Sequence, residues 1–192
     1  MIKDLVYANR SCRRFREDRR LGRSDLLALI DLARLSASHR NAQELRFCPV
    51  WEEAQSEEVF RHVGFGAALG KEGQPREGQR PPAYIFIIGE SAEQNYLWVD
   101  VGVACQSILL GAAEQGMLGC MLGNIQREKL RPILGLRDSD PPILLGLALG
   151  YPDEEFVIEK GTPEGSRKYW REGRENHVPK LALADIVLEK NS

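Results

Sequence analysis

The sequence predicts an α+β fold in which a mostly antiparallel sheet is flanked by helices. Two observations predict it: apolar runs typical of strands alternate irregularly with segments of helical periodicity, and the regular β-α-β repeat of a doubly wound parallel sheet is absent. The chain has 192 residues, so we expect a single domain over residues 1–192. A chain of this length buries roughly 70 % of its unfolded surface.

Two amphipathic helices are expected near the N-terminus. Residues 2–9 place several apolar side chains on one helical face. A second helix is predicted to begin at Ser24, whose hydroxyl suits an N-cap position. The buried face of this second helix is formed by Leu26, Leu29, Ile30 and Ala33.

Short apolar runs predict four strands. Residues 46–51 form the first, and Pro49 suits the edge of a sheet or a bulge because it cannot donate to a neighbour. Residues 83–89 are continuously apolar, which is typical of a strand buried on both faces. Residues 117–123 and 143–150 form the remaining two, on either side of a short amphipathic helix.

One long segment predicts a central helix and another predicts a loop. Residues 96–116 are apolar on both sides of a helix, which is typical of a core or dimer-interface position. Gly116 suits the position just after the helix end. Residues 64–82 are rich in Gly, Pro and charge, and we expect a mobile loop, too long for a simple connection.

Composition narrows the class of protein. The net charge of −2 and the pI near 6.0 argue against a nucleic-acid-coating protein. The four cysteines form no C-x-x-C pair and the three histidines lie far apart, so no metal site is expected. The first residues lack the apolar core of a signal peptide, and the run 141–152 is too short to cross a bilayer. We therefore expect a cytoplasmic protein without a membrane partner.

Residues 9–23 carry seven arginines. Arg10, Ser11 and Arg13 follow a predicted helix directly, and two guanidinium groups with a hydroxyl suit the oxygens of a phosphate. The alternatives to a phosphate site are a solvated charged surface and a nucleic-acid-binding segment. The later arginines fit a solvated surface, because Glu17 and Asp18 lie among them.

Two further segments combine polar groups or glycines at the ends of elements. Ser38, Asn41 and Gln43 either satisfy a helix end or meet the polar edge of a heterocycle, since amides both donate and accept. Gly119 and Gly123 either form turns or allow a ligand to approach the backbone. No catalytic triad, G-x-G-x-x-G or phosphate-binding loop is present, so a cofactor is expected to supply any reactive group.

In this order, the segments resemble the nitroreductase family of FMN-dependent oxidoreductases. The chain carries R-S-x-R-x-F at residues 10–15, S-x-x-N-x-Q at 38–43, D-x-G-x-x-x-Q at 100–106 and G-Y-P at 150–152. A glycine-rich strand and turn at 116–124 matches the family less closely. Each motif alone is weak, but together they span nearly the whole chain.

The resemblance implies an intertwined homodimer with FMN at the subunit interface. Residues 151–192 are then a C-terminal extension that packs on the partner subunit. By the same resemblance, the FMN phosphate and ribityl chain are held by Arg10, Ser11, Arg13 and Lys180. Ser38, Asn41 and Gln43 approach the flavin from the partner subunit. The backbone of Leu122, Gly123 and Asn124 lies along the isoalloxazine ring.

The resemblance also implies an activity. FMN takes hydride from NADH or NADPH and reduces an electron-poor acceptor such as a nitroaromatic or quinone, by a ping-pong mechanism without a catalytic side chain. The alternative is a non-catalytic or specialised flavin-binding protein on the same fold. Two features favour this alternative. Many relatives carry a basic residue where this chain has Asn9, and the loop 64–82 does not align with the family.

Overall fold

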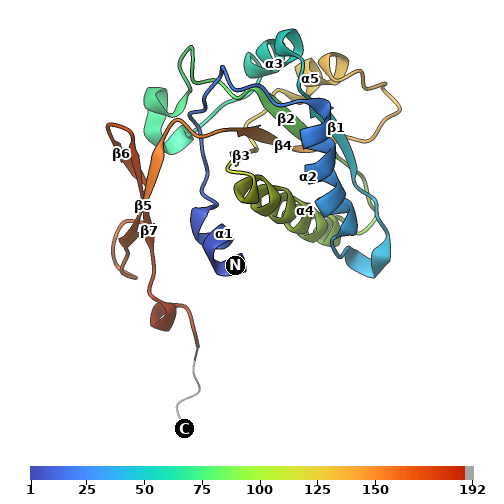
Figure 1. Ribbon diagram of the computed structural model, residues 1–192. Helices are drawn as coiled ribbons and strands as arrows, with labels where there is room; N and C mark the ends of the chain where they lie inside the picture. The colour runs from blue at the N-terminus through green and yellow to red at the C-terminus, as the bar shows by residue number, and fades with distance from the viewer. Residues whose placement is uncertain (189–192) are drawn as a thin grey trace.

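The computed structural model describes residues 1–188 and has an α+β architecture, as predicted (Figure 1). A four-stranded antiparallel sheet lies at its centre in the order β1-β2-β4-β3. Its strands are β1 (Arg46–Val50), β2 (Ala83–Ile88), β3 (Leu118–Leu122) and β4 (Ile143–Gly150). The helices are α1 (Ile2–Ala8), α2 (Arg23–Leu35), α3 (Glu53–Phe60), α4 (Gln94–Glu114) and α5 (Arg127–Ile133). Short 3-10 helices are η1 (His39–Asn41), η2 (Ala67–Gly73) and η3 (Leu183–Asp185).

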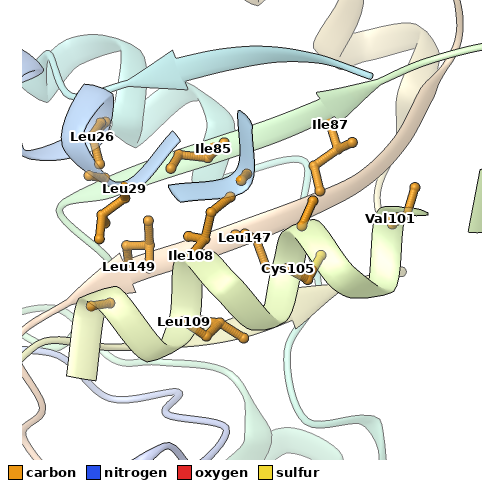
Figure 2. Packing of buried hydrophobic residues seen from close by; sticks show 14 of the residues in the cluster. Leu26, Leu29, Ile85, Ile87, Val101, Cys105, Ile108, Leu109, Leu147 and Leu149 are labelled. Carbon is orange, nitrogen blue, oxygen red and sulfur yellow. The ribbon is translucent and has the colours of Figure 1, made fainter. Parts of the chain in front are cut away.

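The strands alternate side chains between two apolar cores. On one face, Ile85 and Ile87 of β2 pack with Leu147 of β4 against helices α2 and α4 (Figure 2). On the other face, Tyr84 and Phe86 of β2 pack against the N-terminal segment and the helices α3 and α5. Every residue of β2 is buried, so the prediction of a strand covered on both faces is confirmed. The edge position predicted for Pro49 in β1 is also confirmed.

Helix α4 crosses one face of the sheet and packs against α2. By length and composition it is apolar enough to cross a membrane, but half of the apolar window is buried in the protein, as in a soluble core helix. One side of the helix is buried in the core, whereas Trp98 and Val99 are exposed on its outer side. The predicted core position is therefore confirmed for one side, and a dimer-interface position for the other stays a prediction. The helix ends at Gly116, whose φ of 74° confirms the predicted position after the C-cap.

One local prediction is wrong, and one helix was not predicted. Helix α2 begins at Arg23 with Gly22 as N-cap, not with Ser24, because the Asp25 carboxylate accepts a hydrogen bond from the Gly22 amide at 2.8 Å. Helix α3 (Glu53–Phe60) was not predicted, since its apolar signal is weak and only Ser56 and Val59 are buried.

The loop 64–82 and the C-terminal segment contain more structure than the sequence predicted. Within 64–82, η2 forms and Phe65 is buried. Beyond residue 151, strands β5 (Glu155–Lys160), β6 (Trp170–Glu172) and β7 (Glu175–Lys180) form a second sheet in the order β5-β7-β6. Packing of this extension on a partner stays a prediction, and its residues 189–192 lie outside the described residues.

Candidate functional site

The arginine segment is attached to the edge of the central sheet. Ser11 forms a parallel bridge with Gly119 of β3, and the Cys12 amide donates to the Gly119 carbonyl at 3.0 Å. Gly119 has no room for a side chain, because an added Cβ would lie 2.6 Å from Leu109 Cδ2 of α4. Further along, the Arg16 amide donates to the carbonyl of Tyr151 at 2.8 Å. These contacts fix the backbone of the residues that are predicted to bind the phosphate.

A cavity of about 400 Å³ opens between this segment, α4, β3 and the second sheet. Its lining includes four predicted site residues, Arg10, Ser11, Arg13 and Lys180, although Lys180 lies 167 positions after Arg13 in the chain. The remaining lining residues are Val6, Asn9, Gln106, Leu109, Gly119, Met121, Phe156, Tyr169, Asn176 and Val178. Three basic side chains and no carboxylate line the part of the cavity that the structure describes, so it suits an anion.

The arginines of this cavity have spare hydrogen-bonding capacity. The Nε atoms of Arg10 and Arg13 are buried and have no hydrogen-bond partner among the described residues. Burial lowers the pKa of the Arg10 guanidinium, because the charged form loses solvent. Arg13 is held over the ring of Tyr169, with its guanidinium carbon 4.5 Å from the ring centroid. A bound anion would supply both charge compensation and acceptors.

Glu154 is a buried carboxylate that joins the arginine segment to the second sheet. Its Oε1 accepts hydrogen bonds from the amides of Arg13 and Arg14 at 2.5 and 3.2 Å. Its Oε2 accepts from Asn176 Nδ2 at 2.6 Å and from the guanidinium of Arg171. The side chains of Glu154 and Arg171 are 0 % and 4 % exposed. The Arg13 backbone therefore depends on a residue 141 positions away.

The alternation of the second sheet explains how Lys180 reaches this cavity. On β7, residues 176, 178 and 180 share one face, and all three line the cavity. Phe156, which pairs with Asn176 in register, lines it from β5. The C-terminal strands thus form one wall of a cavity whose other wall is the arginine segment.

The three predicted ring-contact residues lie at the end of β3. Leu122 is buried, so its side chain belongs to the core and only its backbone is available. Gly123 is exposed, and an added Cβ would meet nothing within 4 Å. Gly119 and Met121 share the cavity side of β3 by alternation, and Gly123 follows directly after the strand ends. The Asn124 carbonyl accepts from the Gly64 amide at 2.9 Å.

Ser38, Asn41 and Gln43 lie elsewhere in the chain. Ser38 and Gln43 line a second cavity of about 320 Å³, which shares no lining residue with the first. Asn41 and Gln43 have φ angles of 54° and 52°, a backbone conformation that residues other than glycine rarely adopt. Asp100 of α4 supports this turn, because its Oδ1 accepts from the His39 amide at 2.8 Å. One chain therefore does not bring this group to the basic cavity.

The other arginines of the segment serve different purposes. Arg19 lies over the ring of Tyr151, 3.3 Å from its centroid, and Arg20 donates to the Trp51 carbonyl at 3.1 Å. Arg16 is exposed. Arg14 is partly buried beside Arg171, and burial together with that neighbouring charge lowers its pKa. Within residues 1–188, no group of three or more His, Cys, Asp or Glu residues is arranged to hold a metal ion.

The fold and the cavity together define an α+β protein with a basic pocket at the edge of its central sheet. The chain belongs to the nitroreductase family, whose family model matches residues 6–151. The family inferred from the motifs is confirmed.

Known proteins resemble the chain in sequence and in fold. The 4-nitrobenzoate reductase of Pseudomonas putida is 32 % identical over 80 residues, which cover 41 % of this chain and 34 % of that protein. The match therefore spans about a third of the length of this curated relative.

Solved structures share the fold at low sequence identity. A nitroreductase family protein from Streptococcus pneumoniae has a TM-score of 0.68 at 17 % identity, covering 99 % of this chain and 100 % of that chain. The NADPH:FMN oxidoreductase from Vibrio harveyi, solved with NAD+, has a TM-score of 0.65 at 16 % identity, covering 90 % and 79 %. A nitroreductase family protein from Clostridium novyi has a TM-score of 0.64 at 19 % identity, covering 80 % and 86 %.

Sequence reasoning missed Glu154, Asn176 and Tyr169. Glu154 follows the G-Y-P motif by two residues, but nothing local to it indicates a contact with Arg13. Asn176 did carry a signal, because it precedes Lys180 by four residues on an extended segment and must share its face.

Proposed function

We propose that this protein is an FMN-dependent oxidoreductase that takes hydride from NADH or NADPH and reduces an electron-poor acceptor. The observation that carries the proposal is the basic cavity, in which Arg10, Ser11, Arg13 and Lys180 meet from opposite ends of the chain. Family membership supplies the flavin class, and the FMN oxidoreductase from Vibrio harveyi shares the fold.

The residues present fit the phosphorylated end of FMN. A phosphate dianion brings several acceptor oxygens, and the cavity offers two guanidinium groups, an ammonium group and a hydroxyl. The buried, unpartnered Nε atoms of Arg10 and Arg13 are donors that such an anion would satisfy. A merely solvated arginine surface would leave these nitrogens exposed to water instead.

The remaining site residues complete the pocket in a homodimer. The exposed backbone at Gly123 and Asn124 lets a flat ring lie along the end of β3. Ser38, Asn41 and Gln43 do not line the basic cavity of their own chain, and we assign them to the cavity of the second subunit. Support for a dimer comes from α1, where no residue is buried and Ile2 and Tyr7 are each 65 % exposed.

When bound, FMN supplies the chemistry, accepting hydride from the nicotinamide and passing reducing equivalents to the acceptor in two successive half-reactions. The protein's own part is to hold the phosphate, to orient the ring along β3 and to leave one ring face open. The acceptor class is a nitroaromatic or quinone, which needs an open slot more than a proton-donating side chain.

The purified protein, with FMN added, provides the test. An absorption spectrum typical of bound flavin is expected, with bleaching by NADH or NADPH and recovery on addition of 4-nitrobenzoate or a quinone. Parallel lines in double-reciprocal plots would support the ping-pong order. Protein that takes up no FMN would refute the proposal. Yellow protein that oxidises neither nicotinamide would favour the non-catalytic flavin-binding alternative.

A further inference from the structure

Asn176 carries a buried side-chain amide in which only one of the two polar atoms has a hydrogen-bond partner among the described residues. It lies on β7, is 1 % exposed and lines the basic cavity. Its Nδ2 donates to Glu154 Oε2 at 2.6 Å, whereas its Oδ1 has no partner among the described residues. Buried polar atoms are nearly always paired, so an orphaned acceptor at the wall of a cavity calls for an explanation.

The neighbouring carboxylate fixes which atom of the amide is free. Glu154 Oε1 accepts from the amides of Arg13 and Arg14, and Oε2 accepts from Arg171. An ionised carboxylate held by these donors can only accept from Asn176. Rotating the Asn176 amide by half a turn would place its oxygen against Oε2, so Oδ1 remains the atom without a partner.

The unpartnered Oδ1 of Asn176 defines which hydrogen-bonding groups a ligand needs. The basic side chains of the cavity, Arg10, Arg13 and Lys180, donate and therefore suit the acceptor oxygens of a phosphate. Asn176 Oδ1 instead requires a donor. A ligand that satisfies both parts of the wall carries an anionic group and a hydrogen-bond donor such as a hydroxyl group.

We propose that Asn176 is a specificity-determining residue that accepts a hydrogen bond from a hydroxyl of the phosphorylated ribityl chain, with Glu154 holding its amide in place. The inference rests on the proposed function, because it takes FMN as the ligand. It concerns a part of the chain beyond residue 151, where the match to the family model ends.

The first test uses the unaltered protein and changes only the ligand. Dissociation constants are measured by flavin fluorescence for FMN and for three analogues that each lack one ribityl hydroxyl. One analogue is expected to bind about 10-fold more weakly than FMN, equivalent to about 1.4 kcal/mol. Equal affinity for all four ligands would overturn the inference and leave the proposed function intact. Absence of any FMN binding would overturn both.

Two variants then assign the effect to the residue. Asn176→Ser keeps a hydroxyl that can donate to Glu154, but its oxygen is attached directly to Cβ and lies one bond further from the ligand than Oδ1. The 10-fold discrimination should therefore disappear. Val178→Ala alters the same face of β7 and the same cavity without changing a polar group, so it should keep the discrimination. Discrimination that survives in Asn176→Ser would mean that another group recognises the hydroxyl. Circular dichroism identifies folded variants, and the ligand series decides the question even if a variant does not fold.

Discussion

At the residue scale, the seven arginines of residues 9–23 divide by burial and partner. Arg10 and Arg13 line the cavity and have buried Nε atoms without a hydrogen-bond partner among the described residues. Arg19 instead lies over the ring of Tyr151, and Arg20 donates to the carbonyl of Trp51. The sequence motif predicted this division, because R-S-x-R marks the first two. It could not predict that Arg13 depends on Glu154, since that contact joins two segments 141 positions apart.

The first prediction concerns the charge that holds FMN. Arg10→Ala and Arg13→Ala should each weaken FMN binding by about 1.5–3 kcal/mol, the usual value of a charge-assisted hydrogen bond. Arg16→Ala removes the same charge from an exposed position of the segment and should leave the affinity unchanged. Fluorescence titration with FMN measures all three. Similar losses in the three variants would mean that the segment acts through its net charge alone.

A buried thiol gives a prediction on pH. Burial raises the pKa of Cys105 from 9.0 to about 12. Between these values the unfolded chain has lost the thiol proton while the folded chain keeps it, so the free energy of unfolding falls as pH rises. One such group contributes a slope of about 1.4 kcal/mol per pH unit.

Urea unfolding at several pH values above 9 measures this slope. Cys105→Ala should lose free energy of unfolding less steeply with pH than the wild type, by about the contribution of one group. Ile108→Val, a buried change on the same helix, should cost about 0.5–1.5 kcal/mol at every pH without altering the slope. An unchanged slope in Cys105→Ala would show that Cys105 ionises in the folded protein.

At the element scale, local signals predicted the central elements better than the peripheral ones. The continuous apolar run predicted strand β2, because a strand buried on both faces consists of apolar residues. The glycine after α4 predicted the end of that helix, because a positive φ favours glycine. The sequence signals of helix α3 and strand β5 are weaker. Strand β5 is only half-buried along most of its length, so its alternation carries little apolar contrast.

Two glycines at opposite ends of β3 give the second element-scale argument. Gly116 has a φ of 74°, so Gly116→Ala should destabilise the fold by about 1–2 kcal/mol without affecting FMN. Gly123 has room for a Cβ in the free protein, so Gly123→Ala should leave the free energy of unfolding nearly unchanged. The added methyl would instead meet the ring and weaken FMN binding. Urea unfolding and FMN titration measure the two effects, and a stability loss in Gly123→Ala without an effect on FMN would contradict this role.

At the scale of the whole molecule, the site is built from distant parts of the chain. The resemblance predicted Arg10, Ser11, Arg13 and Lys180 as one group, and all four line the cavity. The second sheet was not predicted, and with it Asn176 and Glu154 were missed, since residues beyond 151 carry little apolar periodicity. The N-terminal segment and the C-terminal strands meet through one buried carboxylate, so removal of either wall would open the cavity.

The last prediction couples assembly to the cofactor. Helix α1 lies next to α4 (Figure 1), has no buried residue, and leaves Ile2 and Tyr7 each 65 % exposed. If a second subunit covers this surface and supplies Ser38, Asn41 and Gln43, then Tyr7→Lys should shift the protein toward monomer and release FMN together. Light scattering with size exclusion measures the mass, and the absorbance of the same peak measures the flavin.

The control is Ala54→Lys, the same introduction of a positive charge at an exposed apolar position on α3, on the far side of the sheet from α4. It should remain dimeric and keep FMN. Loss of the dimer by Tyr7→Lys with full retention of FMN would refute the shared site, because a cavity completed within one chain has no need of the partner. Loss of flavin with an intact dimer would place Tyr7 in the pocket rather than at the interface. Coupled loss is expected, since Arg10 and Arg13 can hold the phosphate within one chain, whereas the residues proposed for the ring come from two.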